Sequence, residues 1–128
     1  MISTRILVVD DDPGILKLLR LTLTRAGFDV DSAEDGDQAL RRVAYQKPDL
    51  VLCDILMPNL DGYESLAAIR NNPNTADLPV LIISALGESR SVQRAMDAGA
   101  NGYFIKPFEH RDLVNRIHHL LLAREVAT

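Results

Sequence analysis

The chain has one cysteine, Cys53, and no apolar run long enough to cross a bilayer. A single thiol excludes an internal disulfide framework, and we expect Cys53 to be a small buried side chain. A single cysteine also suits a reducing compartment, so we predict a cytoplasmic protein. The lack of a long apolar run predicts that the chain does not span a membrane. The first apolar run, residues 6–9, is only four residues long and acids follow it at once, which is not the pattern of a signal peptide.

No stretch of the chain is rich in Lys or Arg, and the 14 basic and 18 acidic residues give a net charge of −4. This balance argues against direct binding of nucleic acid by the chain itself. Internal repeats and low-complexity segments are also absent. The 128 residues are 47% apolar, which predicts one globular domain with a full core.

Three continuous apolar runs, residues 6–9, 50–53 and 80–83, consist almost entirely of Val, Ile and Leu. Such runs are typical of parallel strands that are buried on both faces. Residues 28–31 alternate apolar and polar side chains, the pattern of a less buried edge strand. Residues 103–105 are expected to form a fifth, short strand.

Helices are predicted between the strands, at about residues 13–26, 36–46, 63–70, 89–98 and 109–123. This strict alternation predicts an α/β fold with a parallel sheet and helices on both faces. Placing the apolar strands centrally gives the strand order 2-1-3-4-5, the flavodoxin-like doubly wound (βα)5 arrangement. We assign residues 1–123 to this domain and residues 124–128 to a C-terminal tail or a linker stub.

Two acidic residues fit roles in local structure. Asp12 precedes Pro13, as an N-cap precedes a first helical proline. Asp61-Gly62 is expected to turn the chain. Gly27 is expected to cap the end of the first helix.

Polar side chains follow four of the predicted strands. They are Asp10 and Asp11, Asp54, Ser84, and Lys106. Ligands in doubly wound sheets bind at the carboxyl ends of the strands, so we expect these groups to converge. Carboxylates that converge repel one another unless a cation lies among them. Hard oxygen ligands favour Mg²⁺, with Asp10, Asp11 and Asp54 as the metal-binding carboxylates.

Zinc does not fit, because no cluster of Cys and His exists. The histidines, His110, His118 and His119, fall on the last predicted helix. Neighbouring helical positions face different ways, so we expect surface residues there.

Carboxylates, one lysine and one hydroxyl suit the handling of a phosphoryl group. Lys106 and a metal can neutralise its equatorial oxygens, and Ser84 can donate a hydrogen bond to one of them. Asp54 stands alone at its strand end and is our candidate nucleophile, which would form an aspartyl-phosphate.

The sequence resembles the receiver domain of two-component response regulators, including the chemotaxis-regulator-like receivers, over about residues 5–122. The resemblance rests on the stretches ILVVDDD, CDILMPNLDG, IISA and GYFIKPF, in this order. It implies that Asp54 accepts a phosphoryl group from a sensor histidine kinase or a phosphotransfer protein. It further implies that Asp11, Asp54 and the main-chain carbonyl of Leu56 bind Mg²⁺, with Asp10 acting through water.

The resemblance also implies how the signal spreads. Ser84 and Tyr103 match the switch pair of the family, and the bond between Lys106 and Pro107 matches a cis peptide. The switched face would be built from the fourth helix, the fifth strand and the last helix, where a partner docks or a homodimer forms. Such a domain phosphorylates and slowly dephosphorylates itself, and is not an enzyme with a released substrate. An output domain would lie beyond the sequence given.

The chain departs from the family pattern in two places. Leu56 and Leu86 occupy the positions that flank the attacking water, and neither can hydrogen-bond a water. We therefore predict slow hydrolysis of the phosphorylated form. The acidic pair used by one dimerising subfamily is replaced by Asn101-Gly102, which argues against that dimer.

Three alternatives remain from the residues alone. A haloacid-dehalogenase-like phosphatase would use the aspartate at the first strand end, but a Thr after its second Asp is missing. A flavin or nucleotide binder needs a Gly-rich phosphate loop where this chain has acids. A degenerate receiver would serve only for docking, although all the site residues are present.

Overall fold

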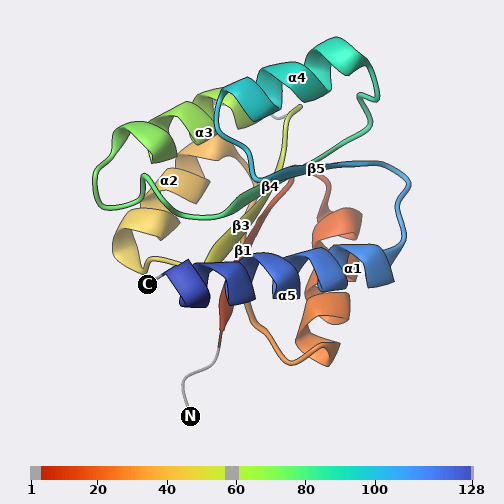
Figure 1. The fold of residues 1–128 in the computed structure, drawn as a ribbon. Coiled ribbons are helices and arrows are strands. Elements are labelled where there is room, and N and C mark those ends of the chain that lie inside the picture. Colours follow the sequence, from red (N-terminus) through yellow and green to blue (C-terminus); the bar gives the residue numbers. More distant parts are fainter. Residues whose placement is uncertain (1–3, 57–60, 128) are drawn as a thin grey trace.

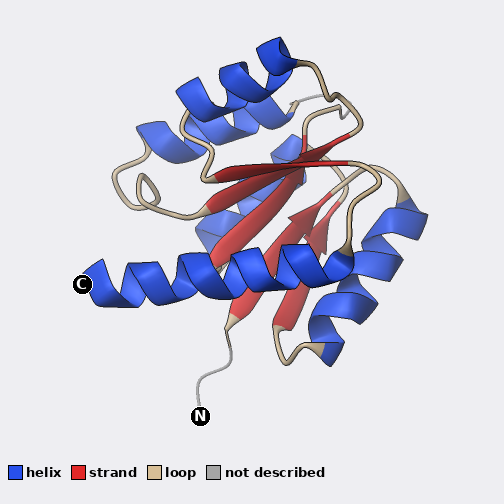
Figure 2. Cartoon of the chain, turned by 45° about the vertical axis from the view of Figure 1, so that its right-hand side comes forward, coloured by secondary structure: helices blue, strands red, loops and turns tan. Residues whose placement is uncertain are grey.

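Five strands and five helices alternate along the chain, as the sequence predicts. The computed structural model describes residues 4–56 and 61–127. The strands are β1 (Arg5–Val9), β2 (Asp29–Ala33), β3 (Leu50–Asp54), β4 (Val80–Ser84) and β5 (Gly102–Ile105). The helices are α1 (Pro13–Arg25), α2 (Gly36–Tyr45), α3 (Gly62–Asn71), α4 (Ser89–Asp97) and α5 (His110–Ala127). The strands form the middle layer between two layers of helices (Figure 1 and Figure 2).

The sheet is parallel and its strand order is β2-β1-β3-β4-β5, which confirms the predicted doubly wound arrangement. The register keeps the strand ends level: Val9 pairs with Cys53, and Ser84 pairs with Ile105. The residues that follow these strands therefore meet at one edge of the sheet.

Each face of the sheet is covered by its own set of helices, because successive strand side chains point to opposite faces. Leu7 and Val9 belong to a core with the buried residues of α2, α3 and α4. Ile6 and Val8 pack with the buried residues of α1 and α5. The central strands β3 and β4 are buried along their whole length, as their continuous apolar runs predict.

The predicted helix signals are present. The side chain of Asp12 accepts a hydrogen bond from the Gly14 amide and caps α1, with Pro13 in the first turn. Gly27 has a φ of 97° just beyond the end of α1, a left-handed conformation that glycine adopts readily. Asp61 does more than turn the chain, because it forms a capping box with Glu64 at the start of α3.

Two element boundaries differ from the prediction by more than one residue. Strand β2 runs to Ala33 instead of residue 31, because pairing with β1 continues through Ser32 and Ala33. Helix α5 continues to Ala127 instead of ending at residue 123, since residues 123–127 contain good helix formers and no breaker. Arg124 lies in this extension and donates a hydrogen bond to the carbonyl of Asp49. The division of the chain at residue 123 stays a prediction.

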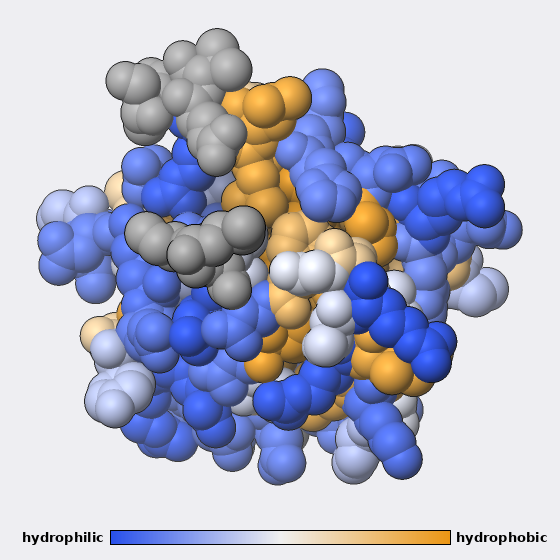
Figure 3. Space-filling model, turned by 90° about the horizontal axis from the view of Figure 1, so that it is seen from below, coloured by the Kyte–Doolittle hydropathy of each residue, from blue (hydrophilic) through white to orange (hydrophobic). Residues whose placement is uncertain are grey.

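The lower end of the molecule carries an apolar area, seen from below in Figure 3. A hollow of about 410 Å³ opens there, lined by Thr4, Ala26, Gly27, Phe28, His118, Leu121 and Leu122. The ring of His118 lies against Phe28, with 5.1 Å between the centroids.

None of the helices in the described part of the chain combines the length and apolar character that crossing a bilayer requires.

Candidate functional site

Three aspartates meet at the carboxyl edge of the sheet. Asp10 and Asp11 follow β1, and Asp54 ends β3, the strand next to β1. Ligand oxygens of the three carboxylates lie within 4.8 Å of one another. Asp10 and Asp54 are buried, whereas Asp11 is exposed. The predicted convergence of these residues is therefore present in the fold.

Lys106, which follows β5, reaches back across β4 to this cluster. Its Nζ lies 3.0 Å from Oδ2 of Asp10 and 3.4 Å from Oδ2 of Asp54. Burial opposes the charge of the ammonium, but the hydrogen bond to Asp10 and the charge of Asp54 outweigh it, and the pKa of Lys106 is raised. The peptide bond between Lys106 and Pro107 is cis, as the sequence resemblance implies.

The carboxyl of Asp54 is in an environment that disfavours its charge. Burial, and then the neighbouring charge of Asp10, raise the pKa of Asp54, while Lys106 and the backbone amide of Leu56 act in the opposite direction. The amide nitrogen of Leu56 lies 3.4 Å from Oδ1 of Asp54. One ammonium thus offsets two buried carboxylates only in part, and an added cation would relieve the remaining repulsion.

The donor set of the cluster fits a hard divalent cation. Its ligand atoms are carboxylate oxygens, which Mg²⁺ prefers over the nitrogen and sulfur ligands of zinc. The exposed carboxylate, Asp11, leaves one side of the cluster open to solvent, where water can complete an octahedral shell. The residues present therefore suit Mg²⁺.

Cys53, which precedes Asp54, is buried, as the sequence predicts. Its Sγ donates a hydrogen bond to the carbonyl oxygen of Asp54 at 3.3 Å. Burial first, and then the neighbouring aspartates, raise the pKa of the thiol well above its usual value. Cys53 is therefore a neutral packing residue of β3 and no nucleophile.

Ser84 and Tyr103 are joined through the backbone of Leu86. The buried hydroxyl of Ser84 accepts a hydrogen bond from the Leu86 amide at 3.1 Å. The hydroxyl of Tyr103 donates to the Leu86 carbonyl at 2.6 Å. The backbone amide of Lys106 donates to the Ser84 carbonyl. The loop after β4 is thus hydrogen-bonded to both residues of the predicted switch pair, Ser84 and Tyr103.

The two leucines expected to flank an attacking water each lie two residues beyond a polar strand-end residue, Leu56 after Asp54 and Leu86 after Ser84. The side chain of Leu56 is 56% exposed. Leu86 is half-buried and packs against the core below α2, α3 and α4. Residues 57–60, which belong to the CDILMPNLDG stretch, lie outside the described residues.

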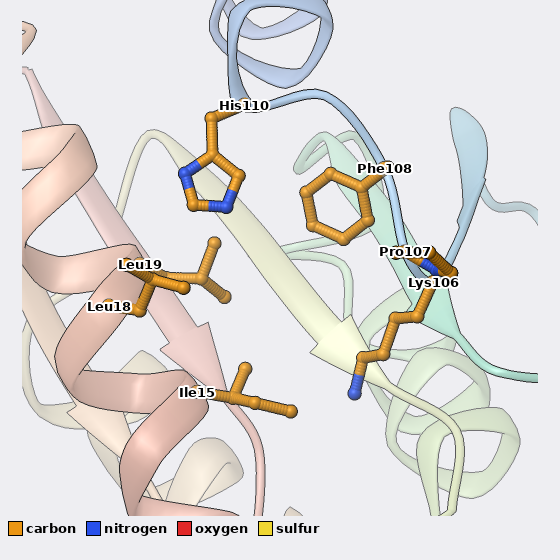
Figure 4. A pocket seen from close by; sticks show the side chains of 7 residues that line it. All are labelled: Ile15, Leu18, Leu19, Lys106, Pro107, Phe108 and His110. Atoms are coloured by element: carbon orange, nitrogen blue, oxygen red, sulfur yellow. The ribbon is translucent and has the colours of Figure 1, made fainter.

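An apolar groove opens beside Lys106, between α1 and the loop that joins β5 to α5 (Figure 4). Its volume is about 340 Å³, and it is lined by Ile15, Leu18, Leu19, Lys106, Pro107, Phe108 and His110. Nδ1 of His110 is hydrogen-bonded to Oγ1 of Thr22 at 2.9 Å. The sequence predicts His110 to be a surface residue. This prediction is wrong, because His110 is half-buried between α1 and α5.

The groove could have been suspected from α1 itself. Leu18 and Leu21 are apolar residues that do not belong to the inner face, and they are 50% and 48% exposed. Helix α1 also carries Lys17, Arg20 and Arg25 and no acidic residue. This outer face is therefore apolar and basic in a chain whose net charge is negative.

The geometry of the cluster supports the transfer of a phosphoryl group. Three groups can surround an anion here. They are the partly compensated carboxylate of Asp54, the Lys106 ammonium 3.4 Å from it, and the buried hydroxyl of Ser84 at the end of the next strand. Such a site acts by positioning and by electrostatic stabilisation of charge that develops on the phosphoryl oxygens.

Comparisons with known proteins agree with this chemistry. The model of the response regulator receiver domain family matches residues 6–118. The DNA-binding dual master transcriptional regulator RpaA of Synechocystis sp. is 38% identical over 117 residues, which are 91% of this chain and 48% of that protein. The alkaline phosphatase synthesis transcriptional regulatory protein PhoP of Bacillus subtilis is 36% identical over 125 residues, 98% of this chain and 51% of that protein.

Solved structures agree with the fold. The crystal structure of a CheY-like response regulator receiver domain protein from Methanospirillum hungatei is similar with a TM-score of 0.93 and 27% identity, covering 99% of this chain and 100% of that one. The chain spans about half the length of the curated relatives that it matches.

Proposed function

Because this chain belongs to the response regulator receiver domain family, we propose that Asp54 accepts a phosphoryl group from the phosphohistidine of a sensor kinase or phosphotransfer protein. The observation that carries this proposal is the position of Asp54, buried beside Asp10 and Asp11 and within 3.4 Å of the Lys106 ammonium. A partly uncompensated carboxylate in contact with a cation is the arrangement that an activated carboxylate nucleophile needs.

In the transfer step, a carboxylate oxygen of Asp54 forms a bond to phosphorus. The bond between phosphorus and the imidazole nitrogen of the donor breaks, and that nitrogen keeps the electron pair. Lys106 and Ser84 are placed at the neighbouring strand ends, where they would contact the phosphoryl oxygens and stabilise their charge. The product is an aspartyl-phosphate on this chain, so the domain would be a phosphoacceptor without turnover of a released substrate.

Mg²⁺ would be held by Asp11, Asp54 and the main-chain carbonyl of Leu56, with Asp10 in the surrounding shell. When bound, the ion would neutralise negative charge on the phosphoryl oxygens. The proposal is supported by the oxygen-only donor set and by the raised pKa of Asp54, which burial and Asp10 cause.

The protein donor would seat apolar side chains in the groove of Figure 4. Lys106 lines this groove, so a side chain placed in it would contact the lysine whose Nζ lies 3.4 Å from Asp54. The acid-free helix α1 beside it favours a donor surface on which acidic residues flank the apolar ones.

Phosphorylation would then change the face made of α4, β5 and α5 and control an output partner, a homodimer or an effector domain. Ser84 and Tyr103 are the expected switch pair, and their shared contact with Leu86 gives them a common element to move. On this face Arg116 donates to the carbonyl of Asn101 within the chain, at a position where one dimerising subfamily has an acid. A cytoplasmic location, where such a partner kinase would act, stays a prediction.

Phosphorylation by a small-molecule donor tests the proposal. Acetyl phosphate with Mg²⁺ should add one phosphoryl group to the wild type, seen by intact-protein mass spectrometry, and EDTA should prevent it. Asp54→Asn should not be labelled, whereas the surface control Asp12→Asn should be labelled normally. Equal labelling of Asp54→Asn would overturn the proposal, and steady turnover of p-nitrophenyl phosphate would favour a phosphatase instead.

A further inference from the structure

Helix α4 has little apolar attachment to the rest of the fold. Ala95 is its single buried residue, and Met96 is 41% exposed. The N-cap residue, Glu88, makes no side-chain capping hydrogen bond. One small side chain constrains the tilt and rotation of a helix only weakly, so contacts with β5 and polar contacts to the neighbouring α3 add to the positioning of α4. The two helices lie side by side on one face of the sheet (Figure 1 and Figure 2).

The C-terminal end of α4 is anchored by Arg70 of α3. The guanidinium donates two hydrogen bonds to the Gly99 carbonyl, at 3.0 Å and 2.8 Å, and one to Oδ1 of Asn101 at 2.9 Å. It also donates to the carbonyl of Leu78 at 2.6 Å. A Cβ at Gly99 would lie 2.9 Å from Nε of Arg70, so glycine permits this close approach. Arg70 thus ties the end of α4 to α3 and to the start of β4.

Helix α4 itself is held by a different residue of α3, Tyr63, which contacts Ser91 in its first turn and Arg94 in its last turn. The phenol hydroxyl donates to the carbonyl of Ser91 at 3.1 Å. The guanidinium of Arg94 lies over the same ring, 3.8 Å from its centroid, a cation–π contact. Tyr63 is only 9% exposed, so its ring is packed in the core while its hydroxyl is hydrogen-bonded to α4.

Tyr63 is also next to the residue that joins α3 to the phosphoacceptor strand. The amide of Gly62 donates to the carbonyl of Ile55. A Cβ at Gly62 would collide with the carbonyl oxygen of Asp54 and would lie 2.7 Å from Cα of Ile55. The first turn of α3 is therefore in direct contact with the backbone of Asp54, and a shift there would move Tyr63.

We propose that Tyr63 is a positioning residue that couples Asp54 to α4, through Gly62 on one side and through Ser91 in the first turn and Arg94 in the last turn of α4 on the other. This coupling is separate from the Ser84–Tyr103 pair, which acts through Leu86. It rests on the proposed function, because it supplies a second path from the phosphoacceptor to the same output face. Arg70 holds the segment that follows α4, through Gly99 and Asn101, so the motion would be a pivot of α4 about its C-terminal end.

Amide hydrogen exchange on the intact chain tests the attachment. Tyr63→Phe removes the hydroxyl but keeps the ring, Arg94→Met removes the cation but keeps the length, and Tyr63→Leu removes both contacts. Amides of residues 92–95 should exchange about fivefold faster in Tyr63→Phe, the factor that corresponds to about 1 kcal/mol for one hydrogen bond. Amides of residues 98–101 should keep the wild-type rate. Tyr45→Phe, the same change on a ring that is 91% exposed, is the matched control.

The response to the phosphoryl analogue beryllofluoride with Mg²⁺ tests the coupling. In the wild type, exchange should change at residues 92–95 and at Leu86 and Tyr103. In Tyr63→Leu and Arg94→Met the change at residues 92–95 should fall at least by half, while that at Leu86 and Tyr103 persists. Equal responses in the wild type and in these variants overturn the coupling alone. A wild type that responds nowhere overturns the proposed function and the coupling with it.

Discussion

Nζ of Lys106 lies 3.0 Å from Oδ2 of Asp10, although 96 positions of sequence and the two strands β3 and β4 separate these residues. This contact is shorter than the one between Lys106 and Asp54, at 3.4 Å. Two buried carboxylates thus share one ammonium, and the charge of the phosphoacceptor is compensated only in part.

Mg²⁺ should stabilise the wild type. A ligand that binds only the folded state stabilises it by mass action, so about 100 Kd of Mg²⁺ should raise Tm by about 10 °C for a domain of this size. Asp11→Asn should lose most of this rise, because it removes one charged ligand. The matched control is the adjacent Asp12→Asn, where Asn still caps α1. Thermal unfolding with and without Mg²⁺ measures the effect, and an Asp11→Asn variant that keeps the full rise would argue against Asp11 as a ligand.

Without metal, Asp54→Asn should be more stable than the wild type at neutral pH. Burial and Asp10 raise the pKa of Asp54 in the folded state, so the folded state binds the Asp54 proton more tightly than the unfolded state does. The wild type should therefore lose stability relative to the variant as pH rises from about 4 through the raised pKa. Below this window the two proteins should converge. Urea unfolding across the pH range in EDTA gives the difference, and a gap that widens toward acid pH would contradict the sign.

Leu18→Asp should weaken phosphorylation by a protein donor about tenfold or more, equivalent to about 1.4 kcal/mol. Leu18 lines the groove beside Lys106, whereas Leu21 is equally exposed on α1 but does not line it. Leu21→Asp is therefore the control. Initial rates with a purified histidine kinase that phosphorylates the wild type give the comparison, and acetyl phosphate serves as the donor that needs no docking. A Leu18→Asp variant that is equally slow with acetyl phosphate would place the defect in the site and not in docking.

Leu86→Glu should shorten the life of the phosphorylated form by about tenfold, since a carboxylate there can orient a water that leucine cannot. Leu86→Met keeps an apolar side chain and should leave the rate unchanged. Loss of label after removal of the donor, followed by mass spectrometry, gives both rates. Fast loss that is equal in the wild type and in Leu86→Glu would refute the proposed role of this leucine.

Much of the candidate site could be predicted because its residues are tied to strand ends. Asp10, Asp54, Ser84 and Lys106 each follow an apolar run, and in a parallel sheet the ends of such runs lie at one edge. The edges of the elements were less predictable. β2 continues to Ala33 because pairing with β1 continues, and α5 continues to Ala127 through residues that read equally well as a tail or as helix.

The sequence by itself determined the layered α/β fold, the strand order and the identity of the acidic cluster, because hydrophobic periodicity and strand-end polarity are local properties of the chain. Only the tertiary structure decided that Lys106 contacts Asp10 more closely than Asp54, and that His110 lies half-buried beside Thr22. It also decided that Tyr63 contacts α4 and that Arg70 holds the segment after it. These are contacts between residues far apart in sequence. They depend on side-chain reach and helix placement, which no periodicity encodes.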